Sequence, residues 1–162
     1  MKKYIKFLPL LILIITTLSC KKEAFNGLSD VRPTVPVTVT NAIDFRPEPT
    51  VSSSLSSGGN IQITLAIPAS SGRKIKEITK VATSTSYTAI QSTGTTGFYT
   101  AAPIAVGDIT YTFTSSLAEY KAKNGGTIPP ANNELGRRFY FLITLDDGSI
   151  VIPESVRVLV VN

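Results

Sequence analysis

The chain has 162 residues, and its 16 lysines and arginines outnumber its 11 aspartates and glutamates, for a formal charge of +5 at neutral pH. It contains one cysteine and neither histidine nor tryptophan. Without histidine, a catalytic device of the Ser-His-Asp or Cys-His type cannot be built, and zinc lacks its usual nitrogen and sulfur ligands. The composition therefore predicts a protein that is not an enzyme and uses neither a cofactor nor a metal.

The first twenty residues have the pattern of an export signal. Lys2, Lys3 and Lys6 form a basic start, residues 7–18 form a nearly unbroken apolar run, and a small residue follows directly before Cys20. A basic start, a short apolar core and a small residue before the cut define a secretory signal peptide. A spanning helix needs about 20 apolar residues, so this run is too short to be one. An ordinary secretory peptide with a cysteine nearby by chance is the alternative.

The residues around the cysteine resemble the lipobox of bacterial lipoproteins. Ser19 and Cys20 are followed by Lys21-Lys22-Glu23, which is similar to the start of many small cell-envelope lipoproteins of Bacteroidota. The usual leucine three residues before the cysteine is replaced by Thr17. The resemblance implies that residues 1–19 are removed and that Cys20 carries the lipid. It also implies a lipid-anchored protein of the cell envelope, in the outer membrane, with an accessory, scaffold or binding role.

Removal of the signal changes the charge balance. Three of the 16 basic residues lie in the signal, so 13 basic and 11 acidic residues remain. A nucleic-acid partner would require a basic patch or stripe, and the sequence shows none, so we expect no such partner. Residues 20–32 comprise the cysteine and a stretch without apolar periodicity, which predicts a flexible tether. Residues 33–162 are expected to form one domain.

The first part of this domain alternates between strand patterns and loops. Alternating valines predict a strand at residues 35–39, and the serine-rich residues 52–60 predict a loop. Strict alternation at residues 61–67 is typical of a half-buried strand. At residues 75–83 a bulged strand and a short helix both fit, and the β-branched residues favour the strand. Two short strands are expected next, at residues 87–90 and 98–100.

A clear strand pattern at residues 109–113 is followed by a helix signal. Ser116 and Glu119 match a capping box, in which the serine hydroxyl accepts from the backbone N–H three residues later. We therefore expect a short helix at residues 116–123, with its apolar side chains facing the core. Residues 124–134 should form a long loop.

The C-terminal residues predict a β-hairpin. Residues 139–145 alternate, and Asp147-Gly148 is a strong two-residue turn signal. A type I′ turn there would place Leu145 opposite Ile150 and Phe139 opposite Val156, before a last strand at residues 156–160. About seven short strands and one short helix near 116–123 resemble an all-β, antiparallel immunoglobulin-like β-sandwich, without the cysteine pair and tryptophan of true immunoglobulins.

Tyrosines are the candidate ligand-binding residues, because exposed aromatic rings pack on the apolar faces of sugars. Tyr87, Tyr99 and Tyr140 are the candidates, with a place in the core as the alternative for each. Tyr140 would lie on the opposite face of its strand from Phe139 and Phe141. Together with the 124–134 loop, these tyrosines predict an alternative role as a surface domain that binds a glycan or another envelope protein. Carboxylates could also serve a hydrolase, and the candidates are Glu119, Glu134, Asp146, Asp147 and Glu154.

Overall fold

The computed structural model describes residues 33–92, 98–100 and 102–162, and one compact unit spans Pro33–Asn162. The described chain is mainly β, with ten strands in three small sheets that are mostly antiparallel. Cys20, the signal pattern and the tether lie outside the described residues. No described helix is long and apolar enough to cross a membrane.

Sheet A has the order β1-β3-β6 and is antiparallel, with β1 at Thr38–Val39, β3 at Asn60–Ala66 and β6 at Thr110–Ser116. Ile61, Ile63 and Leu65 of β3 are fully buried, so the alternation in the sequence is the alternation of the two faces. The strands predicted at residues 61–67 and 109–113 are confirmed. The strand predicted at 35–39 is shorter, because only Thr38 and Val39 pair with β3.

Sheet B has the order β2-β10-β7, with β2 at Thr50–Ser54, β10 at Arg157–Val161 and β7 at Asn133–Glu134. β2 runs parallel to β10, whereas β7 is antiparallel to it. The loop predicted at residues 52–60 is therefore wrong in its first part, and the loop predicted at 124–134 ends in a strand. The serine-rich composition predicted a loop, but Val51 and Ser53 of β2 are each 1% exposed, whereas Ser52 between them is exposed. This alternation is that of a strand with one buried face.

Sheet C has the order β5-β4-β8-β9 and is antiparallel, with β5 at Ile104–Asp108, β4 at Ile75–Ser84, β8 at Arg138–Leu145 and β9 at Ile150–Val151. β4 is a strand whose register to β8 shifts twice, between Ile75 and Glu77 and between Ile78 and Lys80. These shifts explain the helix-like spacing of its isoleucines, and the bulged strand favoured for residues 75–83 is confirmed.

The hairpin between β8 and β9 has a different register from the predicted one. Thr144 pairs with Ile150 and Ile143 with Val151. The Gly148 N–H donates to the Leu145 carbonyl over 3.0 Å, and Gly148 has φ +84°, so the turn has three residues instead of two. The extra residue turns Ile150 outward, where it is 64% exposed, and buries Val151. The predicted pairing of Phe139 with Val156 is present as an isolated bridge.

Two helices complete the domain. α3 spans Leu117–Asn124, and the Ser116 hydroxyl accepts from the Glu119 N–H over 3.1 Å, as the capping box predicts. The Glu119 carboxylate does not complete the box, since it accepts from the Ser115 hydroxyl over 2.8 Å. α2 spans Thr88–Gln91, where a strand at 87–90 was expected. A 3-10 turn, η1, lies at Ala69–Ser71.

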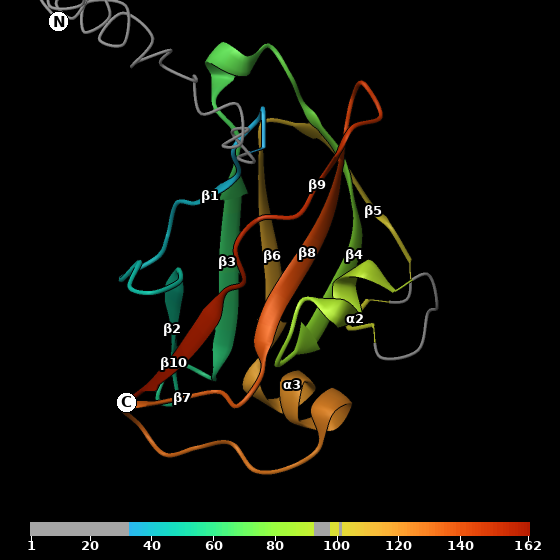
Figure 1. Ribbon diagram of the computed structural model, residues 1–162. Helices are drawn as coiled ribbons and strands as arrows, with labels where there is room; N and C mark the ends of the chain where they lie inside the picture. The colour runs from blue at the N-terminus through green and yellow to red at the C-terminus, as the bar shows by residue number, and fades with distance from the viewer. Residues whose placement is uncertain (1–32, 93–97, 101) are drawn as a thin grey trace, which may run out of the picture. The chain divides into compact units, whose positions relative to one another are not determined.

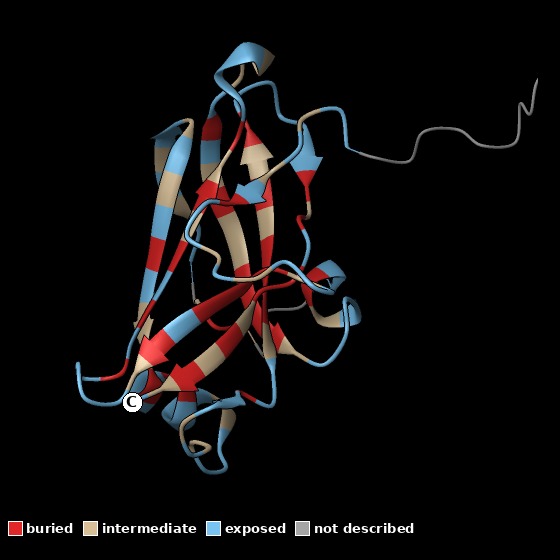
Figure 2. Cartoon of the chain, turned by 90° about the vertical axis from the view of Figure 1, so that its left-hand side faces the viewer, coloured by how far each residue is buried: buried red, intermediate tan, exposed pale blue. Residues whose placement is uncertain are grey.

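Side chains from all three sheets meet in one hydrophobic core. Its aromatic centre consists of Tyr99, Phe113, Phe139 and Phe141, whose rings contact one another at centroid distances of 5.1–5.9 Å. Figure 2 shows the buried residues alternating with exposed ones along the strands. A smaller cluster on the other face of β4 and β8 contains Ala82, Ile90 and Tyr140. The need to cover this second face explains why α2 forms there.

The elements are arranged between two ends of the domain. In Figure 1, β1, η1 and the β8–β9 turn lie toward the upper end, whereas α3 and the C-terminus lie at the lower end. Residues 152–156 separate β9 from β10 and contact β8 through the isolated bridge between Phe139 and Val156. After this break the chain leaves sheet C and enters sheet B as β10. The break holds Pro153 and Ser155, and this is where the loop between β1 and β2 contacts the sheets.

Candidate functional site

The three candidate tyrosines occupy different environments. Tyr140 is 1% exposed in the smaller cluster, on the opposite face of β8 from Phe139 and Phe141 as expected. Tyr87 is 41% exposed, its ring packs edge-to-face on Tyr140 at 4.9 Å, and its hydroxyl accepts from the Ser155 N–H over 3.3 Å. Tyr87 and Tyr140 are thus brought together, but only Tyr87 has an exposed ring surface.

Tyr99 is separate from this pair and lies in the main core, where it is 2% exposed. Its hydroxyl shares a 2.5 Å hydrogen bond with the Ser115 hydroxyl. Burial raises the pKa of Tyr99 to about 12, against the weaker opposing effect of this hydrogen bond. The exposure that a sugar-stacking surface requires is therefore missing at both Tyr99 and Tyr140.

The 124–134 loop is held against the domain at its C-terminal part. The Asn132 N–H donates to the Val160 carbonyl over 2.7 Å, and β7 pairs with β10. Directly after the loop, Leu135 is 7% exposed and its N–H donates to the Val158 carbonyl. This part of the loop therefore extends sheet B.

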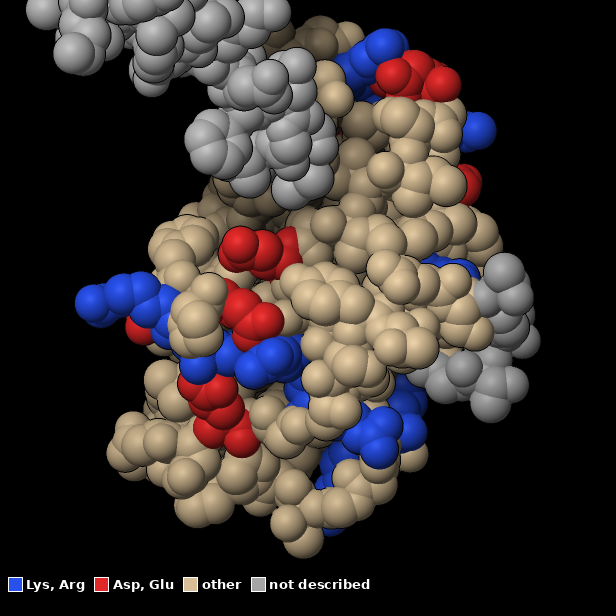
Figure 3. Space-filling model, in the orientation of Figure 1, with Lys and Arg blue, Asp and Glu red and all other residues tan. Residues whose placement is uncertain are grey.

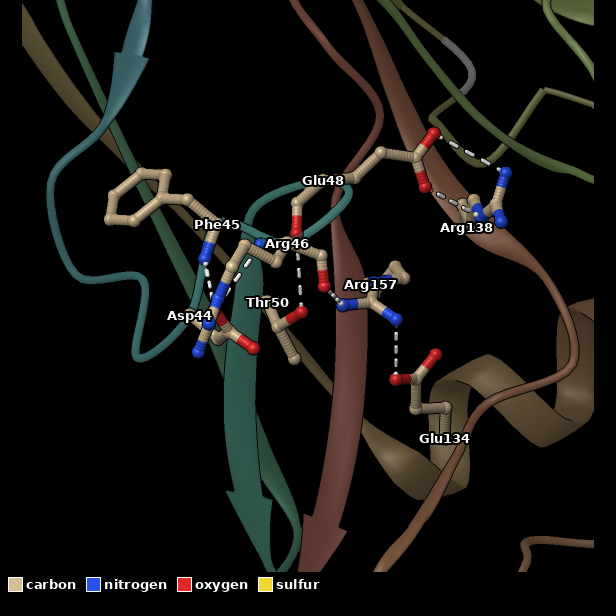
Figure 4. A network of polar contacts seen from close by, with 8 residues as sticks. All are labelled: Asp44, Phe45, Arg46, Glu48, Thr50, Glu134, Arg138 and Arg157. Atoms are coloured by element: carbon tan, nitrogen blue, oxygen red, sulfur yellow. Dashed lines mark hydrogen bonds and ion pairs between the residues drawn. The ribbon is translucent and has the colours of Figure 1, made fainter.

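A network of polar contacts, shown in Figure 4, ties the loop between β1 and β2 to β8 and β10. The Arg138 guanidinium contacts both carboxylate oxygens of Glu48, at 3.0 and 3.3 Å. The same carboxylate accepts from the hydroxyl of the fully buried Ser155 over 2.7 Å. Only 17% of the Glu48 side chain is exposed, whereas the Arg138 side chain is 41% exposed, so this bidentate ion pair is shielded from solvent on its carboxylate side alone.

A second arginine supports the same loop from β10. Arg157 donates to the Glu134 carboxylate of β7 and to the Arg46 carbonyl, each over 2.7 Å (Figure 4). Asp44 accepts from the Phe45 N–H over 2.8 Å, and this bond is the main cause of the lowered pKa of its carboxyl. The network gives the loop a fixed conformation that presents the side chain of Phe45, which is 58% exposed.

Four of the five carboxylates considered for hydrolysis make structural contacts, and the fifth, Glu154, is exposed. Glu134 pairs with Arg157, and Glu119 pairs with Lys123 over 3.2 Å. Asp146 and Asp147 lie in the β8–β9 turn, and their carboxylates are 3.8 and 2.7 Å from the Arg73 guanidinium. The hydroxyl and N–H of Ser149 both donate to Asp147 and lower the pKa of its carboxyl. These contacts show that Asp146 and Asp147 stabilise the turn, where aspartate is a favoured residue.

Acidic and basic side chains lie close together on part of the described surface. Figure 3 shows acidic and basic side chains side by side across the middle of one face, over the loop between β1 and β2. Among residues 33–92, 98–100 and 102–162, no three acidic side chains gather in a group that could hold a metal ion.

Two shallow grooves in the described part of the chain are further candidates for binding, and the sequence patterns indicated neither. The proline groove is apolar, has a volume of about 280 Å³ and is lined by Pro33, Pro36, Val37, Thr38, Val39, Phe45, Pro49, Ile152, Pro153 and Glu154. The serine–amide groove is polar, has a volume of about 380 Å³ and is lined by Asn41, Ser52, Ser54, Ser57, Asn60 and Gln62. Each combines segments that are distant in sequence, so only the fold could reveal it.

Comparison with protein families, with curated proteins and with solved structures finds no match to this chain.

Proposed function

We propose that this protein is a lipid-anchored component of the cell envelope whose β-domain acts as a non-catalytic accessory, scaffold or binding module. The observation that carries the proposal is the single cysteine, Cys20, placed directly after a basic and apolar signal and 13 residues before Pro33, where the compact unit starts. Stable anchoring requires more than one acyl chain, and lipoprotein maturation supplies them on such a cysteine.

The contacts of the charged residues support a non-catalytic role. Glu48, Glu134 and Asp147 each contact an arginine, and these ion pairs fix loops and a turn. A general acid or base must instead be free to exchange a proton with a substrate. The described domain thus uses these charges to hold its own shape.

The anchor is tested by expressing the chain in a bacterium that processes lipoproteins, with a clickable fatty acid in the medium. Wild-type protein should incorporate the fatty acid and sediment with outer membranes. Cys20→Ala should lose both the label and the membrane association, whereas the control Ser19→Ala keeps a small residue before the cleavage site and should retain both. Membrane association of Cys20→Ala equal to wild type would overturn the proposal.

We also propose that the three sheets are a variant of the immunoglobulin-like sandwich. The pairing of β3 with β6, and of β4 with β8 and β9, corresponds to the B–E and C–F–G pairings of that fold. In support of a single sandwich, sheets A and C contribute to one core. An experimental structure in which the faces of these sheets pack at about −30° would agree with this arrangement.

The alternative function is binding of a neutral glycan, and the serine–amide groove is the observation that favours it. Its lining residues offer hydroxyl and amide groups without a charged side chain, and such groups both donate to and accept from sugar hydroxyls. Glycan-array binding that is lost in Gln62→Ala and retained in the control Gln91→Ala, outside the groove, would establish this function. Wild-type protein without glycan binding would exclude it.

A further inference from the structure

The strand β6 forms one edge of sheet A, and no other described strand pairs with its outer side. It has seven residues, Thr110–Ser116, and its only partner among the described residues is β3. At the opposite edge of the sheet, β1 and the Asn41 side chain cover part of β3, since the Asn41 amide bonds the Gln62 carbonyl and the Thr64 N–H. Within the described residues, no side chain bonds the outward backbone groups of β6 in this way.

Two hydrogen bonds show which backbone groups of β6 face outward. The Ile67 N–H donates to the Ile109 carbonyl over 3.0 Å, and the Leu117 N–H donates to the Gly59 carbonyl over 2.8 Å. Between these bonds the register of β6 to β3 is regular. Because the groups of an antiparallel ladder alternate in direction, the odd-numbered residues bond to β3. The N–H and C=O groups of Thr110, Thr112 and Thr114 therefore point away from it.

This edge also lacks the features that usually prevent strands from pairing. Natural edge strands are interrupted by charged residues, proline or bulges, and β6 has the sequence TYTFTSS with no register shift. In contrast, β5 at the edge of sheet C contains Gly107 at φ +75° and ends in Asp108. The edge of β6 is thus uncharged and regular along its length.

We propose that β6 pairs antiparallel with β6 of a second copy of this chain, about a twofold axis at Thr112. The outward backbone groups are symmetric about this residue, so Thr112 would lie opposite its own copy and Thr110 opposite Thr114. The Thr110, Thr112 and Thr114 side chains are exposed on the outer face of the sheet. The hydroxyls of Thr64 and Thr112 already bond across β3 and β6 at 3.0 Å, and cross-strand threonine pairs of this kind stabilise sheets.

Charge and size favour a second copy as the partner and set the strength of the pairing. β6 contains no charged residue, so no like charges oppose each other at the axis. One strand pair buries less than the roughly 1,200 Å² of a standard interface, and the association should therefore be reversible and depend on concentration. The pairing of β6 does not require the lipid anchor. The experiments can therefore refute the proposed dimer without refuting the proposed anchor, and the reverse.

Thiol cross-linking tests the predicted register. In a Cys20→Ser background of the full chain in detergent, Thr112→Cys supplies the only thiol. The two Thr112 Cα atoms should lie about 5.5 Å apart, as in any hydrogen-bonded antiparallel pair, and a short bis-maleimide should give a covalent dimer. In the control Thr110→Cys, each thiol lies opposite Thr114 of the second copy, four residues along the strand from the other thiol. The two thiols are then about 13 Å apart, and this variant should give at least tenfold less dimer.

Sedimentation equilibrium tests the pairing without a cross-linker. Full chain in detergent should show a mass that rises with concentration, and Thr112→Lys should weaken dimerisation at least tenfold, because it places two lysines face to face at the axis. An unchanged melting temperature would show that this exposed substitution leaves the fold intact. Equal cross-linking of Thr112→Cys and Thr110→Cys would overturn the proposal. Cross-linking of Thr112→Cys in cells only to a different protein would also overturn it and assign the edge to a partner's strand.

Discussion

The hydroxyl of Tyr120 fixes the beginning of β8. It donates to the Arg137 carbonyl over 3.2 Å and accepts from the Arg137 N–H over 2.8 Å, while its ring packs on Phe139. The side chain reaches from α3 to the residue just before β8, so the helix and strand are joined at one point. Burial raises the pKa of Tyr120, because the phenolate would be desolvated there.

Tyr120→Phe should lower the free energy of unfolding by about 1–2 kcal/mol, since it removes both hydrogen bonds and keeps the ring. Tyr111→Phe is the matched control, because Tyr111 is half-buried on β6 and its hydroxyl bonds to no residue in the part of the chain that the structure describes. Urea unfolding of both variants measures the difference. Equal stability losses in the two variants would show that the Tyr120 hydroxyl has no special role.

Tyr99 should make the domain sensitive to alkaline pH. Its folded pKa of about 12 is above the value of about 10 of an exposed tyrosine, so folding favours the neutral phenol. This stabilisation is complete below about pH 10 and is lost as the pH rises toward 12. The loss of unfolding free energy between pH 9 and pH 11 should therefore be smaller in Tyr99→Phe than in wild type. A loss of the same size in both proteins would contradict this assignment.

At the scale of elements, the loop between β1 and β2 depends on Glu48. Glu48→Gln should cost about 1–3 kcal/mol, because the Arg138 guanidinium loses its charged partner and the fully buried Ser155 hydroxyl loses a charge-assisted acceptor. Glu154→Gln is the control, since Glu154 is exposed and lies in the same break before β10. Thermal unfolding compares the two, and a Glu48→Gln variant as stable as this control would refute the role of the ion pair.

The corner between β2 and β3 offers a matched pair of glycines. Gly58 and Gly59 have φ of +83° and +67°, but a Cβ on Gly59 would lie 3.1 Å from Leu117, whereas one on Gly58 would contact nothing. Gly58→Ala should cost about 1 kcal/mol from the backbone alone, and Gly59→Ala should cost about 1–3 kcal/mol more from overpacking. Chemical denaturation measures both, and equal losses would mean that Leu117 yields freely.

Some helices and strands were predicted well from the local sequence, and others were not. β3 and α3 have strong local signals, namely the alternation of Ile61, Ile63 and Leu65 and the cap at Ser116, and both were predicted closely. β2 and α2 were missed because tertiary contacts decide them. Ser53 is in a strand because β10 lies beside it, and Ile90 is in a helix that covers Tyr140.

The candidate sites were harder to predict than the strands. The position of Tyr140 opposite Phe139 followed from the two-residue repeat of a strand, but its burial depends on α2 and Tyr87. The proline groove and the serine–amide groove each join residues on both sides of a turn or a break. No local pattern carries that information.

At the scale of the whole molecule, the proposed anchor and the domain are separate parts of the chain. Removal of the proposed signal would take away three lysines, and in the described domain several of the remaining charges form local ion pairs. The domain contains no cysteine, so it depends on its core and polar network for stability. Lipid-anchored copies in one membrane would also meet at a raised local concentration, which would favour pairing through β6.

The most direct test of the central claim is the intact mass of the mature protein purified from bacterial membranes, together with the mass of its N-terminal peptide. We predict that the chain starts at Cys20 and carries a diacylglyceryl thioether on that cysteine, with a further acyl group on its amine where the host adds one. A mature chain with an unmodified Cys20, or one that starts at another residue, would contradict the claim that this protein is a lipid-anchored component of the cell envelope.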